Sequence, residues 1–259
     1  MKNVALITGA SSGIGKEFAR IHAGKGGDLV VVARRADKLE ELKKELEEKF
    51  GVVVHVIAKD LAQPEAAREV YEEVGKAGIS VDYLINNAGF GGRGKFHERD
   101  WTRDLTMINL NVVALTALTR FFLDDMVKRN KGKILNISST ASLMPGPLQA
   151  VYFATKAFVT SFSNAINEEL SDTNITVSAL LPGATESEFA QTSGMDKTEL
   201  FKDVFSAREV AEDGYAGMMA GKLNILAGLS FSQKLMMNSI PFLPKRAAMK
   251  QVKKMQEVS

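Results

Sequence analysis

The sequence of 259 residues contains no cysteine, which excludes disulfide bonds, thiolate metal sites and a cysteine nucleophile. Only three histidines are present, His22, His55 and His97, which argues against a histidine-based metal site, and we predict no metal. No apolar run reaches the roughly 18 residues of a membrane-spanning helix, and the apolar run after Asn3 is too short for a signal peptide. These absences predict a soluble, cytoplasmic protein.

The formal net charge of +2 is too small to indicate a nucleic-acid-binding protein. The charge is concentrated at one end, because six basic residues and one acidic residue lie between Lys234 and the last residue. Aromatic residues are not interleaved with these bases, so we predict no nucleic-acid partner.

Short apolar runs alternate with helical patterns along most of the chain. Strands are predicted at residues 4–7, 29–33, 52–58, 81–85, 133–137, 175–181 and 223–227. Helices are predicted at residues 14–21, 37–50, 102–128 and 150–170, after Pro64, and after a capping box of Ser206 and Glu209. The alternation predicts an α/β fold, a single doubly wound parallel sheet with helices on both faces. We expect this domain at residues 1–228 and a basic, helical tail at residues 229–259.

The stretch Thr-Gly-Ala-Ser-Ser-Gly-Ile-Gly at residues 8–15 joins the first predicted strand to the first helix. Gly9, Gly13 and Gly15 permit a tight turn and a close approach to the backbone, and the helix N-terminus presents free N–H groups to a diphosphate. A glycine-rich turn that only connects two elements is the alternative.

Polar or glycine-rich segments follow six of the predicted strands, at the edge where open α/β sheets bind their ligands. They are the turn at residues 8–15, Arg34 and Arg35, Asp60, residues 86–89 (Asn-Asn-Ala-Gly), Ser138 and Ser139, and residues 182–185 (Pro-Gly-Ala-Thr). We therefore expect a ligand site along this edge.

The end of the second strand indicates the cofactor. An acidic residue there would hold the ribose 2′-hydroxyl of NAD, but the chain has Ala33, Arg34 and Arg35. A guanidinium suits a 2′-phosphate, so NADP (NADPH) is favoured and NAD is the second choice. Two solvated arginines at a strand end are the alternative.

Tyr152 and Lys156 are four residues apart on a predicted helix and so share one face. A neighbouring cation lowers the pKa of a phenol, so Tyr152 is predicted to exchange a proton with a substrate oxygen. Ser139, at a strand end, would polarise a carbonyl group. An ordinary surface contact between Tyr152 and Lys156 is the alternative.

Together with Asn111, these motifs resemble the classical type of the short-chain dehydrogenase/reductase family over roughly residues 2–227. The resemblance implies hydride transfer between a nicotinamide cofactor and the carbonyl or secondary alcohol of a small-molecule substrate, for which sugars, steroids, acyl chains and xenobiotic carbonyls all stay open and an apolar substrate is one choice. It also implies three groups of cofactor contacts. The phosphates and ribose would contact Gly9, Ser11, Ser12, Gly13, Ile14 and Gly15; the adenosine part Asp60, Leu61, Asn87, Ala88 and Gly89; and the nicotinamide end Pro182, Gly183, Thr185, Tyr152 and Lys156.

The resemblance further implies a catalytic set of Asn111, Ser139, Tyr152 and Lys156. Tyr152 would be the general acid and base, and Lys156 would also hold the nicotinamide ribose. Asn111 would interrupt the long helix and hold a water molecule that links Lys156 to solvent. The complete set favours an enzyme over a cofactor-binding scaffold, which stays as the alternative.

The segment after the last strand departs from the family pattern, because Leu-Ala-Gly-Leu-Ser at residues 226–230 replaces an Asp-Gly-Gly-like segment. A homodimer or homotetramer is expected, although this departure puts the usual four-subunit packing in doubt. The loop at residues 186–205 covers an apolar substrate or packs onto the body. Its apolar residues are Met195, Leu200, Phe201, Val204 and Phe205.

The tail carries Phe231, Leu235, Met236 and Ile240 near helical spacing, followed by basic residues. Such a stripe packs on the body or on a second subunit, or it lies on an anionic membrane surface. We favour packing over peripheral membrane contact.

Overall fold

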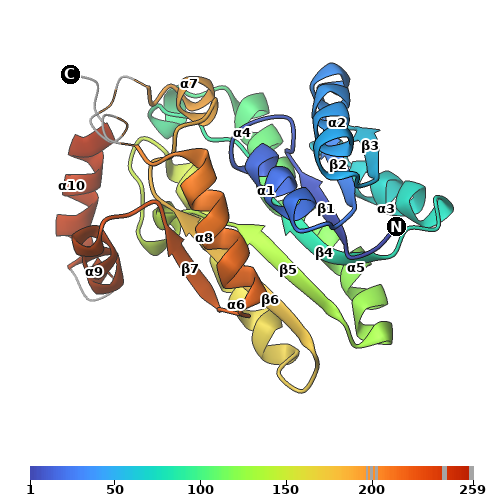
Figure 1. Cartoon of the computed structure of the whole chain (residues 1–259). Coiled ribbons are helices and arrows are strands. Elements are labelled where there is room, and N and C mark those ends of the chain that lie inside the picture. Colours follow the sequence, from blue (N-terminus) through green and yellow to red (C-terminus); the bar gives the residue numbers. More distant parts are fainter. Residues whose placement is uncertain (197, 199–200, 202–203, 241–243, 257–259) are drawn as a thin grey trace.

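The computed structural model describes the chain except residues 197, 199–200, 202–203, 241–243 and 257–259. A seven-stranded parallel sheet in the order β3-β2-β1-β4-β5-β6-β7 forms its centre (Figure 1). The strands are β1 (Val4–Thr8), β2 (Leu29–Ala33), β3 (Val54–Ala58), β4 (Val81–Asn86), β5 (Gly132–Ile137), β6 (Ile175–Pro182) and β7 (Asn224–Ala227). All seven predicted strands are present, with ends shifted by no more than two residues.

Helices cover both faces of the sheet, as predicted. One face carries α1 (Gly13–Gly24), α2 (Ala36–Phe50) and α8 (Ala207–Met219), which share a core with β1 and β2. The other carries α3 (Ala66–Lys76), α5 (Leu115–Arg129) and α6 (Ala150–Glu169). Every residue of β1 and β2 is buried, as expected for parallel strands that are covered on both sides.

The long predicted helix spans Trp101–Arg129 as α4 (Trp101–Ile108), a π-helical segment (Asn109–Ala114) and α5. An 18-residue stretch of this helix has a mean hydropathy of 1.4. By length and composition the helix could therefore cross a membrane, contrary to our expectation. Interspersed polar residues hid this property from a search for unbroken apolar runs. Leu118 and Met126 are buried against the sheet, and we assign the helix to the core.

The turn after β1 lies against the end of β4, where the strand order reverses. Thr8 Oγ1 accepts hydrogen bonds from the backbone N–H groups of Asn87 and Ala88, both at 2.9 Å. A Cβ on Gly9, whose φ is +67°, would lie 3.0 Å from the Ala88 Cα. Glycine is therefore required here by conformation and by space, and the two halves of the sheet meet at this point.

Several smaller elements surround the carboxyl edge of the sheet. They are the 3₁₀ turns η1 (Phe96–Glu98) and η3 (Thr140–Leu143), the short helix α7 (Phe189–Ser193), and the tail helices α9 (Phe231–Ser239) and α10 (Lys245–Gln256). The helix α7 lies in the segment that we expected to be a loop. The Ser206–Glu209 capping box is confirmed at the start of α8.

Candidate active site

A cavity of about 950 Å³ opens at the carboxyl ends of the strands and is lined in part by residues of α7, α9 and α10. Of the predicted cofactor-binding residues, all but Gly15 line it. They are Gly9, Ser11, Ser12, Gly13, Ile14, Arg34, Arg35, Asp60, Leu61, Asn87, Ala88, Gly89, Tyr152, Lys156, Pro182, Gly183 and Thr185. Gly15 lies behind this wall, where a Cβ would collide with the Gly9 carbonyl oxygen and the Asn87 side chain.

The N-terminus of α1 faces the polar end of the cavity. Ser12 is the N-cap residue, but its side chain makes no capping hydrogen bond, and the first turn contains no acidic residue. Because the N–H groups at a helix start favour anions, this turn fits the diphosphate of a dinucleotide.

Arg34 and Arg35 follow β2 and border the same end of the cavity. The Arg35 guanidinium donates to Ser11 Oγ at 3.1 Å and, through two nitrogens, to both carboxylate oxygens of Glu188 at 3.0 Å. Arg35 thereby holds the pKa of the Glu188 carboxyl below its usual value. Glu188 is not among the residues predicted from the sequence, because 153 residues separate it from Arg35.

Asp60 and Asn87 have side chains that are fixed by local hydrogen bonds. Asp60 Oδ1 accepts from the Ala62 N–H at 3.1 Å, and Asn87 Nδ2 donates to the Thr8 carbonyl oxygen at 2.9 Å. These bonds shape the wall between Arg35 and Gly89.

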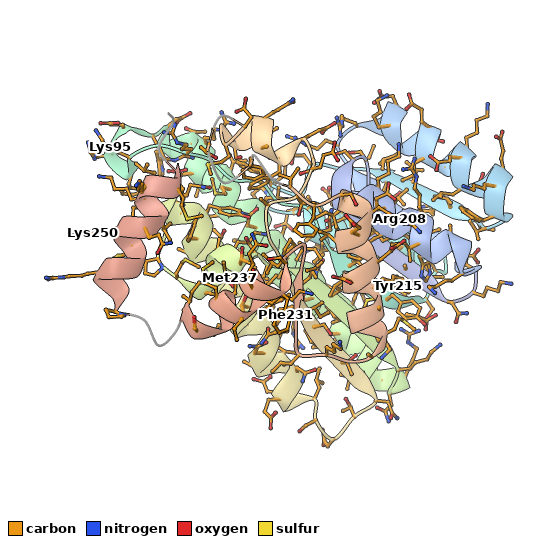
Figure 2. All side chains as sticks on the ribbon, turned by 60° about the vertical axis from the view of Figure 1, so that its left-hand side comes forward. Lys95, Arg208, Tyr215, Phe231, Met237 and Lys250 are labelled. Carbon is orange, nitrogen blue, oxygen red and sulfur yellow. The ribbon has the colours of Figure 1, made fainter. Side chains whose placement is uncertain are left out.

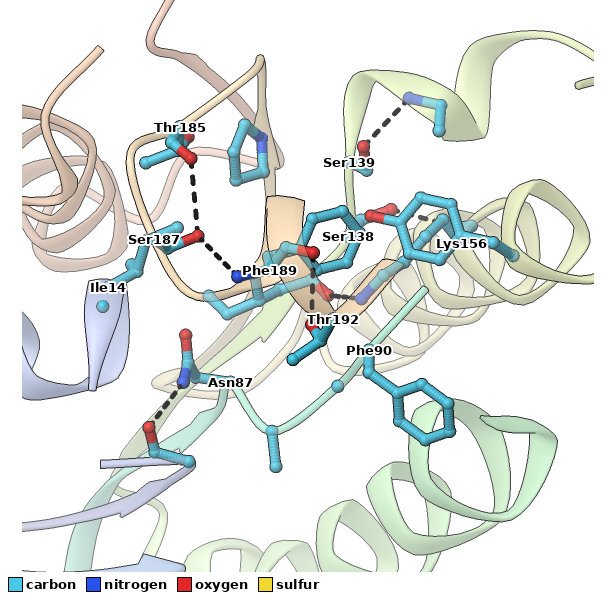
Figure 3. Close-up of a pocket in the computed structure, with 18 of the residues that line it drawn as sticks. Ile14, Asn87, Phe90, Ser138, Ser139, Lys156, Thr185, Ser187, Phe189 and Thr192 are labelled. Atoms are coloured by element: carbon cyan, nitrogen blue, oxygen red, sulfur yellow. Dashed lines mark hydrogen bonds between the residues drawn. The ribbon is translucent and has the colours of Figure 1, made fainter. Parts of the chain in front are cut away.

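Tyr152 and Lys156 lie on α6 and are both buried. Lys156 Nζ is 5.8 Å from the centroid of the Tyr152 ring and donates to the Ile137 carbonyl oxygen at 2.8 Å (Figure 3). Ser139, the N-cap residue of η3, lines the same cavity as Tyr152, and its hydroxyl oxygen accepts from the Ala141 N–H at 3.1 Å. The structure therefore brings these three side chains to one cavity.

The expected effect of Lys156 on Tyr152 is wrong for this arrangement. Burial raises the pKa of Tyr152 to about 12, and the nearby Ser139 hydroxyl offsets this rise only in part. Burial also lowers the pKa of Lys156 to about 8. Desolvation dominates because the ammonium group is directed to the Ile137 carbonyl rather than to the phenol oxygen. Tyr152 is thus a protonated phenol at neutral pH, which suits a proton donor.

Asn111 lies in the π-helical segment and does not line the cavity. Its Oδ1 accepts from the Phe90 N–H at 3.1 Å, and its Nδ2 donates to the Phe90 carbonyl oxygen and to Thr155 Oγ1. A Cβ on Gly89 would lie 3.0 Å from Asn111 Oδ1 and 3.4 Å from Lys156 Nζ. The helix interruption is thus present at Asn111, and both side chains flank Gly89.

The segment after β6 folds over the nicotinamide end of the predicted site. Figure 3 shows Ser187 between Thr185 and Phe189, donating to the Thr185 carbonyl oxygen at 3.4 Å and accepting from the Phe189 N–H at 3.3 Å. The ring of Phe189 lies 5.3 Å from that of Tyr152, so α7 covers the tyrosine.

The other end of the cavity is apolar. Its lining side chains include Phe90, Met144, Phe153, Phe189, Phe201, Met236, Met237, Ile240, Val252 and Met255. Of the loop residues in question, Phe201 lines the cavity, whereas Met195 and Phe205 pack inward and Val204 is exposed. Leu200 lies outside the described residues. The sequence shows the apolar stripe of the tail, but it does not show that Met236 and Ile240 of this stripe line the cavity.

The sequence profile of the short chain dehydrogenase family matches residues 3–198. The chain belongs to this family. A short-chain dehydrogenase from Sphingobium yanoikuyae, solved in complex with NADPH, is 31% identical, with a TM-score of 0.83 over 99% of this chain and 98% of that one. The bulky-bulky ketone specific alcohol dehydrogenase from Comamonas testosteroni is 30% identical, with a TM-score of 0.80 over 99% and 97%.

Among curated proteins, the human very-long-chain 3-oxoacyl-CoA reductase is 37% identical over 185 residues. The match covers 69% of this chain and 58% of the human protein, so this chain spans little more than half of that relative. Family membership makes this dehydrogenase an oxidoreductase that acts on carbonyl or alcohol groups.

We predict that Tyr152→Phe lowers the turnover of the dehydrogenase on the order of 10²-fold or more, because it removes the proton donor but keeps the ring. Cofactor affinity, measured by titrating reduced cofactor fluorescence, should be largely kept. Tyr71→Phe is the matched control, since its hydroxyl donates to Asp125 away from the cavity. Unchanged turnover of Tyr152→Phe would remove the phenol from the mechanism.

Proposed function

We propose that the chain is an NADP(H)-dependent reductase that transfers hydride between the nicotinamide and the carbonyl carbon of a bulky or long-chain apolar ketone. One observation carries the proposal: a single cavity joins an arginine-bordered end to an apolar end, and Tyr152 lies between them. The names of the relatives support both the cofactor and the substrate class, since one relative was solved with NADPH and others are named for bulky ketones or 3-oxoacyl-CoA.

The residues of the polar end fit NADP(H) better than NAD(H). The turn at the start of α1 fits a diphosphate, and Arg34 and Arg35 stand where an acidic residue would hold an unphosphorylated ribose. When bound, the nicotinamide supplies or accepts the hydride. We assign the phosphate contacts to Gly9 and residues 11–14, the 2′-phosphate to the two arginines, the adenine to Asp60 and Leu61, and the nicotinamide end to Pro182, Gly183 and Thr185.

The catalytic groups act on the substrate oxygen. Tyr152, whose high pKa keeps it protonated, gives its proton to the carbonyl oxygen as the carbon is reduced. Ser139 donates a hydrogen bond that polarises the same carbonyl. Lys156 holds the cofactor ribose and stabilises the phenolate that remains, and Asn111 positions the backbone around Gly89 beside Lys156. A scaffold without catalysis would not need this set.

The tail at residues 229–259 is proposed as a cover appended to the dinucleotide-binding domain at residues 1–228. Val252 and Gln256 are buried, and the Arg93 side chain donates to the Gln256 carbonyl oxygen at 2.6 Å. This supports the packing interpretation for α10.

Peripheral membrane contact is the second candidate role of the tail. Phe231 is 85% exposed and Leu235 is 66% exposed, and Figure 2 shows Phe231 on α9 and Lys250 extending outward from α10. Apolar and basic side chains on one surface fit an anionic lipid surface. Failure to sediment with anionic vesicles at low salt, where attraction is least screened, would exclude this role. The cytoplasmic location stays a prediction.

A homodimer through the long helix and α6 is also proposed. Trp101, Val113 and Val127 are exposed apolar residues on the helix, and Phe158 on α6 stacks on Phe162 at 5.5 Å while 40% exposed. Light scattering during gel filtration should give at least twice the monomer mass of 28.2 kDa. A monomer at micromolar concentration would contradict the proposal.

The cofactor assignment predicts that Ala33→Asp combined with Arg34→Gln shifts the preference from NADPH towards NADH by tenfold or more. The reason is that each charge-assisted contact to a phosphate is worth about 1.5–3 kcal/mol. The ratio of kcat/KM for the two cofactors measures the shift. Arg120→Gln, a surface change on α5, is the control and should leave the ratio unchanged. A wild-type preference for NADH would contradict the assignment.

The substrate assignment predicts that Val252→Asp raises KM for a long-chain ketone about tenfold or more, because it places a charge in the apolar wall. NADPH affinity should stay unchanged, since Val252 belongs to the apolar end. Lys250→Gln on the exposed side of α10 is the control. An unchanged KM with every ketone in a panel of increasing chain length would show that the tail does not contact substrate.

A further inference from the structure

Glu188 lies across the polar end of the cavity and precedes α7 directly. Its carboxylate accepts two hydrogen bonds from the Arg35 guanidinium, and Oε2 also accepts one from Ser12 Oγ at 3.1 Å. Arg35 in turn donates to Ser11 Oγ. Two residues that the proposed function assigns to the cofactor, Ser12 and Arg35, are therefore engaged by one acidic side chain.

A carboxylate and a phosphate offer the same kind of oxygen acceptors to a guanidinium and a hydroxyl. The Glu188 carboxylate and a 2′-phosphate cannot both occupy the fork of Arg35. Two anions held side by side would also repel each other. A phosphate that binds Arg35 must therefore displace Glu188, and the exposed ion pair between them is weak enough to break.

The next residue connects this contact to the catalytic tyrosine. Phe189 packs on the Tyr152 ring and lies so close to Gly91 that a Cβ there would be 2.7 Å from its Cζ. The far end of α7 is tied separately, because Arg103 donates to the Thr192 carbonyl oxygen and the Arg93 N–H donates to the Ser193 carbonyl oxygen. Release of Glu188 thus removes one of the contacts that hold the end of α7 that carries Phe189, whose N–H still donates to Ser187 Oγ.

We propose that Glu188 is an internal competitor of the cofactor's 2′-phosphate, and that its displacement by the phosphate moves Phe189 away from Tyr152. The inference rests on the proposed use of NADP(H). By competing for Arg35, Glu188 reduces the preference for NADP(H) over NAD(H). The same contact links binding of the 2′-phosphate to the movement of Phe189, which exposes Tyr152 to the substrate.

The test uses two probes that differ only in the 2′-phosphate, adenosine 2′,5′-bisphosphate and adenosine 5′-monophosphate. Calorimetry should show that Glu188→Gln binds the bisphosphate about two- to fivefold more tightly than wild type, the range expected for loss of one exposed ion pair. Binding of the monophosphate should not change. Glu186→Gln, which removes the same charge from an exposed position in the same loop, should match wild type with both probes.

Amide hydrogen exchange over residues 187–194 tests the movement of α7. In wild type the bisphosphate should raise exchange there and the monophosphate should not. In Glu188→Gln exchange should already be raised without a probe, because the contact with Arg35 is weakened.

The outcomes separate the inference from the proposed function. Wild-type protein that binds both probes equally would overturn the use of NADP(H). A wild type that prefers the bisphosphate, together with a Glu188→Gln variant of unchanged affinity, would overturn only the competition by Glu188. An equal gain in bisphosphate affinity in Glu186→Gln would also overturn the competition by Glu188, since the gain would then come from the loss of any negative charge in this loop. Unchanged exchange over residues 187–194 would overturn the link to Phe189.

Discussion

The close approach between the turn after β1 and the end of β4 is the constraint on which the site depends. Two backbone N–H groups of the β4 end donate to Thr8 Oγ1, and the Asn87 amide donates back to the Thr8 carbonyl. Only glycine fits at Gly9, because any Cβ would press on Ala88. This contact aligns the strand ends of both halves of the sheet, so that the start of α1, the arginines after β2 and the α6 tyrosine all face one cavity.

The cavity separates charge from apolar surface along its length. Arg34, Arg35 and the start of α1 make one end suitable for phosphates, whereas aromatic and methionine side chains make the other suitable for an apolar substrate. Between them, burial keeps Tyr152 protonated and weakens the hold of Lys156 on its proton. Desolvation at this junction thus keeps the phenol in its protonated form in the place where, in our proposal, the carbonyl is reduced.

The strands and main helices could be predicted because their signal is local: apolar runs of β1 and β2 and the stripe of α2 are visible in short windows of sequence. The residues that follow the strands could be assigned to one ligand site for a similar reason, because parallel strands bring their carboxyl ends together. The interruption at Asn111 followed from family resemblance and not from the helical pattern.

What could not be predicted depends on contacts between distant segments. Glu188 meets Arg35 across 153 residues, and α10 meets the cavity through Val252 and Gln256, a partner that its amphipathic pattern does not identify. The pKa of Tyr152 was predicted in the wrong direction because the spacing to Lys156 does not reveal that Lys156 donates to Ile137. Each of these features needs the direction of a side chain, which periodicity does not contain.

In our proposal, one cavity holds the dinucleotide at its arginine end and the substrate at its apolar end, with Tyr152 between them. A crystal structure of the protein with NADP⁺ and an apolar ketone bound together tests this arrangement. We expect the 2′-phosphate on Arg35, the nicotinamide near Thr185, and the ketone oxygen within hydrogen-bonding distance of the Tyr152 hydroxyl. A dinucleotide bound elsewhere, or a ketone held away from Tyr152, would contradict it.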